Sequence, residues 1–230
     1  MKSLVILFLD IFDFFYRLNF VNFFKKIKVN KFDIIFDVGA HKGESIVFFN
    51  KYFNVNKIIS FEPSPINFTK LEKFVKNKKF KSEVILENFG LGLREEKKQL
   101  NQAIESSSST FNEINYNSKY YNKKKNLLNF FSNKKYITKV EVNIINLKSY
   151  MINNKVDKVD LLKIDTEGFE FDVLSGLGDK IQQIKFIFFE HHYDDMYKKN
   201  YTYSDISKLL KDNNFKILHK NKMPFRKTFE

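Results

Sequence analysis

The residues best suited to chemistry form a glycine-rich turn and the acidic strand end that follows it. The turn is Phe36-Asp37-Val38-Gly39-Ala40-His41-Lys42-Gly43, placed between a short apolar run and a predicted helix. Its two glycines permit a sharp turn and a close approach of the backbone to a ligand, and the first amides of a helix offer unpaired N–H donors. Glu62 ends the next predicted strand, where a carboxylate can hydrogen-bond both ribose hydroxyls. The glycine-rich turn and Glu62 together predict a site for a nucleotide-like ligand.

The spacing of the turn separates two classes of nucleotide site. The turn lacks the G-x-G-x-x-G pattern, so a dinucleotide with its pyrophosphate on the helix N-terminus is less favoured. D-x-G-x-x-x-G followed by an acidic strand end is instead similar to the S-adenosylmethionine loop of class I methyltransferases. The alternative for Asp37 and Glu62 is an ordinary strand-to-helix turn and a solvated glutamate at a strand end.

A second acidic turn repeats this layout later in the chain, as Lys163-Ile164-Asp165-Thr166-Glu167-Gly168-Phe169-Glu170. Ligands of open α/β sheets lie outside the carboxyl ends of the strands, so Asp165 and Glu167 are expected to face the same crevice as Glu62. Two carboxylates there can accept a proton from a substrate hydroxyl or hold a divalent metal. The alternative for both is helix N-capping. Lys163 lies among apolar strand residues, and we expect it to pair with a carboxylate.

The neighbouring strand carries a further polar cluster at its end, Glu190-His191-His192. Glu190 and one histidine can orient a substrate hydroxyl, or ligate a metal together with Asp165. Polar cover of a strand end is the alternative for these residues. Glu170 and Asp172 are interpreted as solvated helix residues.

The rest of the chain supplies the elements that must hold these turns. Short apolar strands alternate with helical stretches, which predicts βαβ units, a parallel sheet and a three-layer α/β/α fold. Strands are predicted over 33–38, 57–62, 83–88, 139–144, 159–165, 185–190 and 215–219, and helices over 43–53, 66–76, 147–153, 169–177 and 205–213.

Two segments depart from this alternation. Residues 94–137 are polar and rich in Tyr and Lys, and because long loops in compact domains are commonly lids or binding loops, we expect a lid-like insertion that faces the substrate. Residues 1–28 contain an apolar run too short to span a bilayer, and no small-residue cleavage site follows it. We expect an amphipathic helix packed on the domain or on a partner. The alternative is a helix lying on a membrane surface, with its lysines at the lipid headgroups.

Composition bounds the class of protein. A chain of 230 residues that is 43% hydrophobic can bury one core, which predicts an N-terminal extension over 1–30 and a single domain over 31–230. The lack of cysteine excludes disulfides, thiolate zinc sites and cysteine nucleophiles.

A net charge of +13 admits nucleic acid or an anionic membrane as partners. The lysines are spread along the chain, however, and no RNP-like or zinc-finger pattern favours nucleic acid. A cytoplasmic location fits, peripheral to the inner face of the membrane if residues 1–28 bind lipid.

With these residues in place, the chain resembles the FkbM family of class I, S-adenosylmethionine-dependent methyltransferases. The resemblance rests on four motifs in order, residues 36–43, 61–68, 161–170 and Glu190-His191, and His41 stands where the family usually carries Asn. It implies a doubly wound, Rossmann-like sheet of seven strands and methyl transfer to a hydroxyl of a sugar, glycan or secondary metabolite. The cofactor-binding residues that we expect are Asp37, Gly39, Ala40, His41, Gly43, Glu62, Pro63, Asn88 and Phe89, and the expected catalytic residues are Asp165, Glu167, Lys163 and His191.

The leading hypothesis is therefore an O-methyltransferase that acts on a small molecule or a glycan. Asp165 is the expected base, alone or supported by a divalent metal, and Glu167 and Lys163 shape the acceptor side. An RNA methyltransferase on the same fold is a second hypothesis, although no Asn/Asp-Pro-Pro-Tyr/Phe base-methylation signature is present. A non-catalytic membrane-surface scaffold built on residues 1–28 is a third. The sequence leaves the acceptor, metal dependence and oligomeric state open.

Overall fold

A parallel five-stranded sheet forms the centre of the protein. The computed structural model describes residues 18–103, 109–119, 121–122, 137–193, 195–220 and 228–229. Within them the sheet has the strand order β3-β2-β1-β8-β9, and every neighbouring pair is parallel. The strands are β1 (Lys31–Val38), β2 (Asn54–Phe61), β3 (Glu83–Glu87), β8 (Val159–Ile164) and β9 (Ile184–Phe189). The expected α/β, Rossmann-like fold is confirmed.

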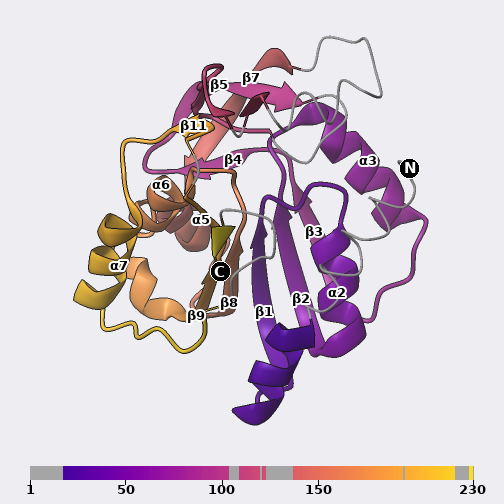
Figure 1. The fold of residues 1–230 in the computed structure, drawn as a ribbon. Coiled ribbons are helices and arrows are strands. Elements are labelled where there is room, and N and C mark those ends of the chain that lie inside the picture. The colour runs from indigo at the N-terminus through magenta and orange to yellow at the C-terminus, as the bar shows by residue number, and fades with distance from the viewer. Residues whose placement is uncertain are drawn as a thin grey trace, which may run out of the picture.

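Helices cover both faces of this sheet, which gives three layers (Figure 1). Helices α2 (Glu44–Tyr52) and α3 (Pro65–Lys76) lie on one side, and α5 (Leu147–Asn153), α6 (Glu170–Ser175) and α7 (Tyr203–Asp212) lie on the other, with a short 3₁₀ helix at Gly178–Gln183. Because side chains alternate along a strand, Ile35 and Ile58 pack toward α2 while Phe36 and Phe61 pack toward α5 and α6. Burial on both faces explains the nearly continuous apolar runs of the strands.

A helix over residues 18–26 adds to the face that α2 covers. Phe20 and Phe24 are buried, and the Phe20 ring lies 4.6 Å from Phe188 and 5.7 Å from Phe48 between ring centroids. This part of residues 1–28 therefore packs on the domain, as the first of the two alternatives expects, and residues 1–17 lie outside the described residues. No helix in the described ranges has the length and apolarity needed to cross a membrane.

A second, smaller sheet lies over the carboxyl ends of the central strands (Figure 1). Its strands are β4 (Gly90–Gly92), β7 (Ile137–Asn146) and β5 (Glu96–Ala103), in the order β4-β7-β5. Residues 94–137 are therefore not a loop throughout: their first part is β5, and Glu113–Ile114 forms β6, which pairs antiparallel with β11 (Tyr197–Lys198). Residues 104–108, 120 and 123–136 of this insertion lie outside the described residues.

The prediction of a closing strand over 215–219 was wrong. Asn214 has φ +67° and ends α7, with Asn214 N–H donating to Lys211 O at 3.0 Å and Phe215 N–H to Leu210 O at 2.9 Å. This pair of hydrogen bonds is the Schellman arrangement that closes a helix C-terminus. Phe215 then packs into the core below α7, and residues 215–220 pair with no strand in the described part of the chain. The central sheet accordingly shows five strands there rather than the seven that the resemblance implies.

The end of β9 leads into one more short pairing. His191–His192 forms β10, which pairs antiparallel with β12 (Thr228–Phe229).

Candidate active site

A cavity of about 340 Å³ opens at the carboxyl ends of the central strands. Its volume lies within the roughly 300–1,000 Å³ typical of small-molecule sites. It brings together most of the residues that the sequence singles out. Those that line it are Gly39, Ala40, His41, Glu62, Pro63, Phe89, Lys163, Asp165, Glu167 and Glu190. Asp37, Gly43, Asn88 and His191 do not line it.

The glycine turn, residues 37–43, needs its glycines for two different reasons. Gly39 has φ +80°, and a Cβ there would overlap the carbonyl oxygen of Asp165, so only glycine lets the turn approach the second acidic turn. The N–H groups of Gly39 and Ala40 both donate to Phe61 O, at 3.0 and 3.1 Å, which ties the turn to the end of β2. Gly43 has φ +96° and N-caps α2, and its missing Cβ leaves room for Phe74 of α3. Gly43 does not line the cavity, but it lets α3 pack against the glycine turn.

Lys163 links the two turns beneath the cavity, as expected. Its Nζ lies 3.0 Å from Asp37 Oδ1 and 3.8 Å from Asp165 Oδ2, and it donates to Gly39 O at 3.1 Å. Asp37 is fully buried, and Lys163 is 8% exposed. Burial alone would lower the pKa of Lys163, but the charges of Asp37 and Asp165 outweigh it and raise that pKa. Lys163 therefore supplies the positive charge that offsets the buried Asp37 carboxylate, whose Oδ2 also accepts from the Ser60 hydroxyl at 3.4 Å.

Glu62 stands at the other end of the cavity with its carboxylate fixed by backbone groups. Its Oε2 accepts from His41 N–H at 2.8 Å, and its Oε1 accepts from Ser64 N–H at 2.9 Å. Burial raises the pKa of Glu62 to about 7, although these two hydrogen bonds act in the opposite direction. Asn88 reaches the site indirectly, because its side-chain amide donates to Glu62 O at 2.8 Å. Phe89, the next residue, lines the cavity.

The second acidic turn, which we call the acceptor turn (residues 165–168), is held in an unusual backbone conformation. Glu167 has φ +52° and Gly168 has φ +97°, a region that non-glycine residues seldom occupy. Two residues of the insertion fix it: Thr110 Oγ1 donates to Glu167 O at 2.8 Å, and the Asn112 side-chain amide donates to Gly168 O. Tyr197 of β11 donates from its hydroxyl to Glu167 Oε2 at 2.9 Å. Three contacts from distant segments thus position the Glu167 carboxylate.

Glu170 is not a solvated helix residue, so that interpretation was wrong. It is fully buried at the start of α6 and accepts hydrogen bonds from Gly168 N–H at 2.9 Å, from Thr166 Oγ1 at 3.0 Å and from the Tyr201 hydroxyl. Burial and the adjacent Glu170 carboxylate raise the pKa of Tyr201. Glu170 therefore stabilises the acceptor turn from below. Asp172 is partly buried, and burial raises its pKa.

Comparison with known families favours a methyltransferase over a dinucleotide-binding protein. A profile of the Methyltransferase FkbM domain matches residues 37–217, well over half of the chain. The chain belongs to the FkbM methyltransferase family. A search of curated proteins and a search of solved structures each gave no match. The matched region contains both turns of this FkbM domain and the ends of β2 and β9, so the methyltransferase class expected from the sequence is confirmed. Membership of the family implies S-adenosylmethionine as the usual methyl donor.

The polar cluster after β9 divides between two environments in this FkbM domain. Glu190 is 6% exposed, lines the cavity, and donates its backbone N–H to Ile164 O at 3.1 Å. The His191 ring lies among tyrosines outside the cavity lining, 4.8 Å from Tyr193 and 5.6 Å from Tyr203 between centroids. Within the described ranges, no group of three or more His, Asp and Glu side chains lies close enough to hold a metal ion. The donor set expected from Asp165, Glu190 and a histidine does not converge there.

Several lining residues of the FkbM domain were not singled out from the sequence. Glu44 and Ser45 begin α2 directly after the glycine turn, and Asn67 lies in the first turn of α3. Glu44, Ser45 and Asn67 each lie at the start of a helix that follows one of the two predicted strand ends. This position could have identified them as cavity residues from the sequence. Ser109 and Phe111 come from the insertion, and no local pattern marks them.

Proposed function

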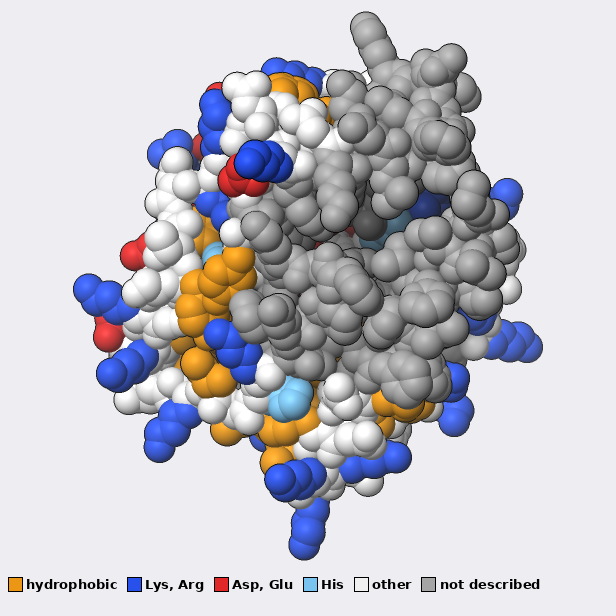
Figure 2. All heavy atoms as spheres, in the orientation of Figure 1, with side chains coloured by type: hydrophobic (Ala, Val, Ile, Leu, Met, Phe, Trp, Pro, Cys, Tyr) orange, Lys and Arg blue, Asp and Glu red, His pale blue; other side chains and the backbone are white. Residues whose placement is uncertain are grey.

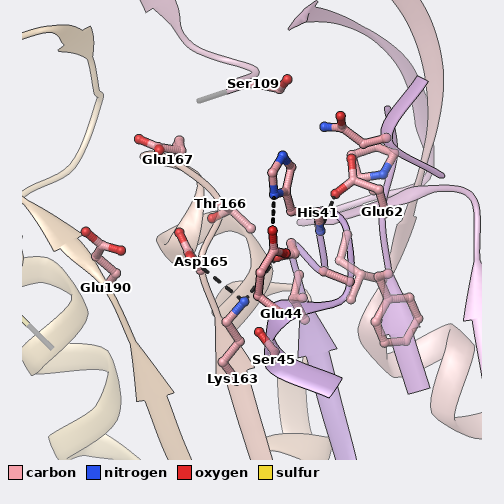
Figure 3. Close-up of a pocket in the computed structure, with 18 of the residues that line it drawn as sticks. His41, Glu44, Ser45, Glu62, Ser109, Lys163, Asp165, Thr166, Glu167 and Glu190 are labelled. Carbon is pink, nitrogen blue, oxygen red and sulfur yellow. Dashed lines mark hydrogen bonds and ion pairs between the residues drawn. The ribbon is translucent and has the colours of Figure 1, made fainter. Parts of the chain in front are cut away.

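We propose that this FkbM domain uses S-adenosylmethionine to methylate a hydroxyl oxygen of a small molecule or glycan. The observation that carries the proposal is the arrangement of opposed acidic walls in one cavity. Glu62 and His41 stand on one side, and Asp165, Glu167 and Glu190 stand on the other (Figure 3). An acidic cavity suits a cofactor whose reactive centre is a cation. It also places carboxylates where an acceptor hydroxyl must lose a proton.

We call the side of the cavity that carries Glu62 and His41 the cofactor wall, and the side that carries Asp165, Glu167 and Glu190 the acceptor wall. The residues on and next to the cofactor wall suit each part of S-adenosylmethionine. The Glu62 carboxylate, already oriented by two backbone N–H groups, retains lone pairs for ribose hydroxyls. Phe89 offers an aromatic face for adenine, and Gly39 permits close approach of the methionine part. Asp37 supports this end through Lys163 rather than by direct contact. When bound, the cofactor supplies a methyl group on a sulfonium that needs no further activation.

On the acceptor wall, Asp165 is the residue that takes the proton. Its side chain is 40% exposed, and its Oδ2 lies 3.8 Å from the Lys163 ammonium. With the cofactor bound, Asp165 would accept the hydroxyl proton as the acceptor oxygen takes the methyl group, and S-adenosylhomocysteine would leave as the neutral product. Glu167, fixed by Tyr197, and Glu190 orient the acceptor. Alignment of the two reactants supplies much of the rate in such an in-line transfer.

A small-molecule or glycan acceptor agrees with the distribution of charge. On the face shown in Figure 2, the Lys and Arg side chains of the described residues are scattered around the rim instead of forming one continuous basic patch. Nucleic-acid binding usually needs such a patch or stripe. We therefore favour an acceptor recognised inside the cavity.

Isothermal titration calorimetry with S-adenosylmethionine and S-adenosylhomocysteine tests the cofactor. We expect both to bind the folded protein, and Glu62→Gln to weaken binding roughly 10- to 100-fold because charged hydrogen bonds to the ribose are lost. Glu83→Gln is the matched control, since Glu83 is exposed and its ion pair with Lys57 lies at the end of β3 away from the cavity. If intact, folded protein binds neither ligand, the proposal is wrong.

The acceptor is then sought by measuring S-adenosylhomocysteine formation with panels of nucleotide sugars, glycans and hydroxylated metabolites. With an acceptor in hand, Asp165→Asn should lower kcat by roughly 10²- to 10⁴-fold, the usual contribution of a general base. An Asp165→Asn enzyme with unchanged kcat would exclude Asp165 as the base.

A further inference from the structure

Two segments far apart in the sequence present hydrophobic side chains to solvent with lysines on either side. One is Lys25-Lys26-Ile27-Lys28, at the end of the helix over residues 18–26, and the other is Lys216-Ile217-Leu218-His219-Lys220, after α7. Ile27, Ile217 and Leu218 are 38%, 68% and 59% exposed, and Ile217 is the most exposed large hydrophobic side chain in the described part of the chain. Hydrophobic side chains that gather on one exposed surface mark sites of contact with proteins or membranes.

The two segments meet and form one surface, which we call the lysine-flanked patch (residues 25–28 and 216–220). The Ile27 N–H donates to Phe23 O at 3.2 Å, so Ile27 follows Phe23 by one helical turn on the same side of the helix. The Phe23 ring stacks on the His219 ring, with 5.1 Å between centroids. Ile27 is therefore one helical turn from the contact that joins this helix to Leu218 and His219.

A second cavity, of about 790 Å³, adjoins the patch along β9. Ile217 and Leu218 border it, and Phe23, Phe24 and Phe186 belong to its walls. None of the described residues that line it is acidic, whereas four are lysines: Lys185, Lys211, Lys216 and Lys220. The patch itself contains five lysines and no aspartate or glutamate. This side of the molecule thus combines exposed hydrophobic side chains with positive charge.

We propose that the lysine-flanked patch docks on the surface of an anionic lipid bilayer, with Ile27, Ile217 and Leu218 inserted among the lipids and the lysines at the headgroups. Burial of hydrophobic side chains and attraction of lysines to anionic headgroups together determine the strength of such surface binding. At the lower end of the molecule, where Figure 1 shows the helix over residues 18–26, hydrophobic side chains lie between lysine side chains (Figure 2). This mixture differs from the continuous basic patch or stripe typical of nucleic-acid binding.

A second copy of this chain fits the patch less well. In a twofold dimer the same surface meets itself, so the five lysines of one copy would face the five lysines of the other. Ile217 and Leu218 also protrude from the surface, which suits a deformable lipid layer better than a rigid partner.

The patch is separate from the candidate active site. Ile27, Ile217 and Leu218 do not line the active-site cavity. Lys28 lies just before β1, at the amino end of the sheet, whereas that cavity opens at the carboxyl ends of the strands. The inference is therefore independent of the proposed function, and docking through the patch leaves the active-site cavity accessible from solvent.

Co-sedimentation of the full chain with lipid vesicles tests the inference. We expect retention by vesicles of phosphatidylglycerol and phosphatidylcholine in equal parts, little retention by phosphatidylcholine alone, and loss of retention at high salt, because salt screens the lysines. The double variant Ile217→Ser, Leu218→Ser should bind roughly 10- to 100-fold more weakly, since it loses two inserted hydrophobic side chains. Lys26→Gln combined with Lys216→Gln should weaken binding roughly 25-fold, at about fivefold for each lysine near an anionic surface.

Matched controls change the same residue types elsewhere. Ile152→Ser alters a side chain of α5 that is 52% exposed. Lys70→Gln combined with Lys97→Gln removes two exposed lysines from α3 and β5. Both controls should bind vesicles as the wild type does, which separates the patch from the overall charge of +13. Circular dichroism and thermal unfolding establish that each variant is folded.

A tryptophan reporter supplies a readout that does not depend on loss of binding. The chain has no tryptophan, so Leu218→Trp introduces a single indole in the patch and Ile152→Trp introduces one outside it. We expect phosphatidylglycerol vesicles to shift the emission of Leu218→Trp to shorter wavelength, because the indole enters the less polar interface that it favours, and to leave the emission of Ile152→Trp unchanged.

Three results overturn the inference: no retention of the folded wild type by anionic vesicles, equal losses in the patch and control variants, or an unshifted emission of Leu218→Trp. Light scattering that shows a dimer, broken by Ile217→Ser with Leu218→Ser, in place of vesicle binding would also overturn it and assign the patch to a second copy of the chain.

Discussion

Replacing Lys163 with methionine tests how the ion pair beneath the cavity holds the site together. The Lys163 ammonium lies 3.0 Å from Asp37 Oδ1, and the Asp37 side chain is fully buried. Methionine fills a similar volume but leaves that carboxylate without a counter-charge. Removing one partner of a buried pair costs about 3–5 kcal/mol. At about 2–4 °C per kcal/mol for a domain of this size, Tm should fall by roughly 10 °C.

The assay is urea unfolding of Lys163→Met, Asp37→Asn and the double variant. If the pair acts as a unit, the loss in the double variant should be smaller than the sum of the two single losses by at least about 1 kcal/mol. Lys148→Met is the control, because its ion pair with Asp179, at 2.7 Å, is exposed and should contribute less than about 1 kcal/mol. Additive losses, or a loss below about 1 kcal/mol in Lys163→Met, would refute this account of the buried pair.

Three further substitutions, and one control substitution at Gly178, test other parts of the site. The pKa of about 7 for Glu62 lies above its ordinary value of 4.5, so ionisation favours the unfolded chain. Relative to Glu62→Gln, the wild type should therefore lose on the order of 3 kcal/mol of stability as pH rises from about 4.5 to above 7, measured by urea unfolding across that range. Gly39→Ala should cost more than about 2 kcal/mol because of backbone overlap, whereas Gly178→Ala, whose φ is also positive but whose nearest neighbouring atom is 3.5 Å from the added Cβ, should cost about 1 kcal/mol. Tyr201→Phe removes a buried donor to Glu170 and should lower stability by about 1.5–3 kcal/mol in thermal unfolding.

The elements around the cofactor wall were predictable because their determinants are local. The apolar strand, the glycine turn and the next strand follow one another along the chain, and a parallel sheet brings their carboxyl ends to one edge. The expectation that Lys163 pairs with a carboxylate follows from the cost of burying an unpaired ammonium, and the structure confirms it with Asp37. The helix predicted over 147–153 has the bounds found for α5.

The errors lie where distant segments decide the environment. Glu170 resembles a solvated helix acid in sequence, and its burial depends on Tyr201, which lies 31 residues away. The strand β5 was missed because seven of its eight residues are polar or small and Leu100 alone shows its apolar side. The strand predicted over 215–219 has a suitable pattern, but Asn214, with φ +67°, closes the C-terminal end of α7, and the residues after it pair with no strand in the described part of the chain. Periodicity within a segment cannot report contacts of this kind.

The two walls of the cavity are therefore specified in different ways, and this bears on the acceptor. The cofactor wall is built by residues adjacent to the glycine turn and to the end of β2, whose conformation follows from their own sequence. The acceptor wall takes its shape from Thr110 and Asn112 of the insertion and from Tyr197 of β11, which together hold Glu167 in a strained backbone conformation. Changes at Thr110 and Asn112 therefore act on the turn that carries Glu167, whereas Gln102 of the same insertion accepts a hydrogen bond from Ser64, beside Glu62, and so contacts the other wall. If the proposed function holds, the determinants of acceptor choice are to be sought in residues 109–119 and 195–201, because these segments hold the turn that carries Asp165 and Glu167.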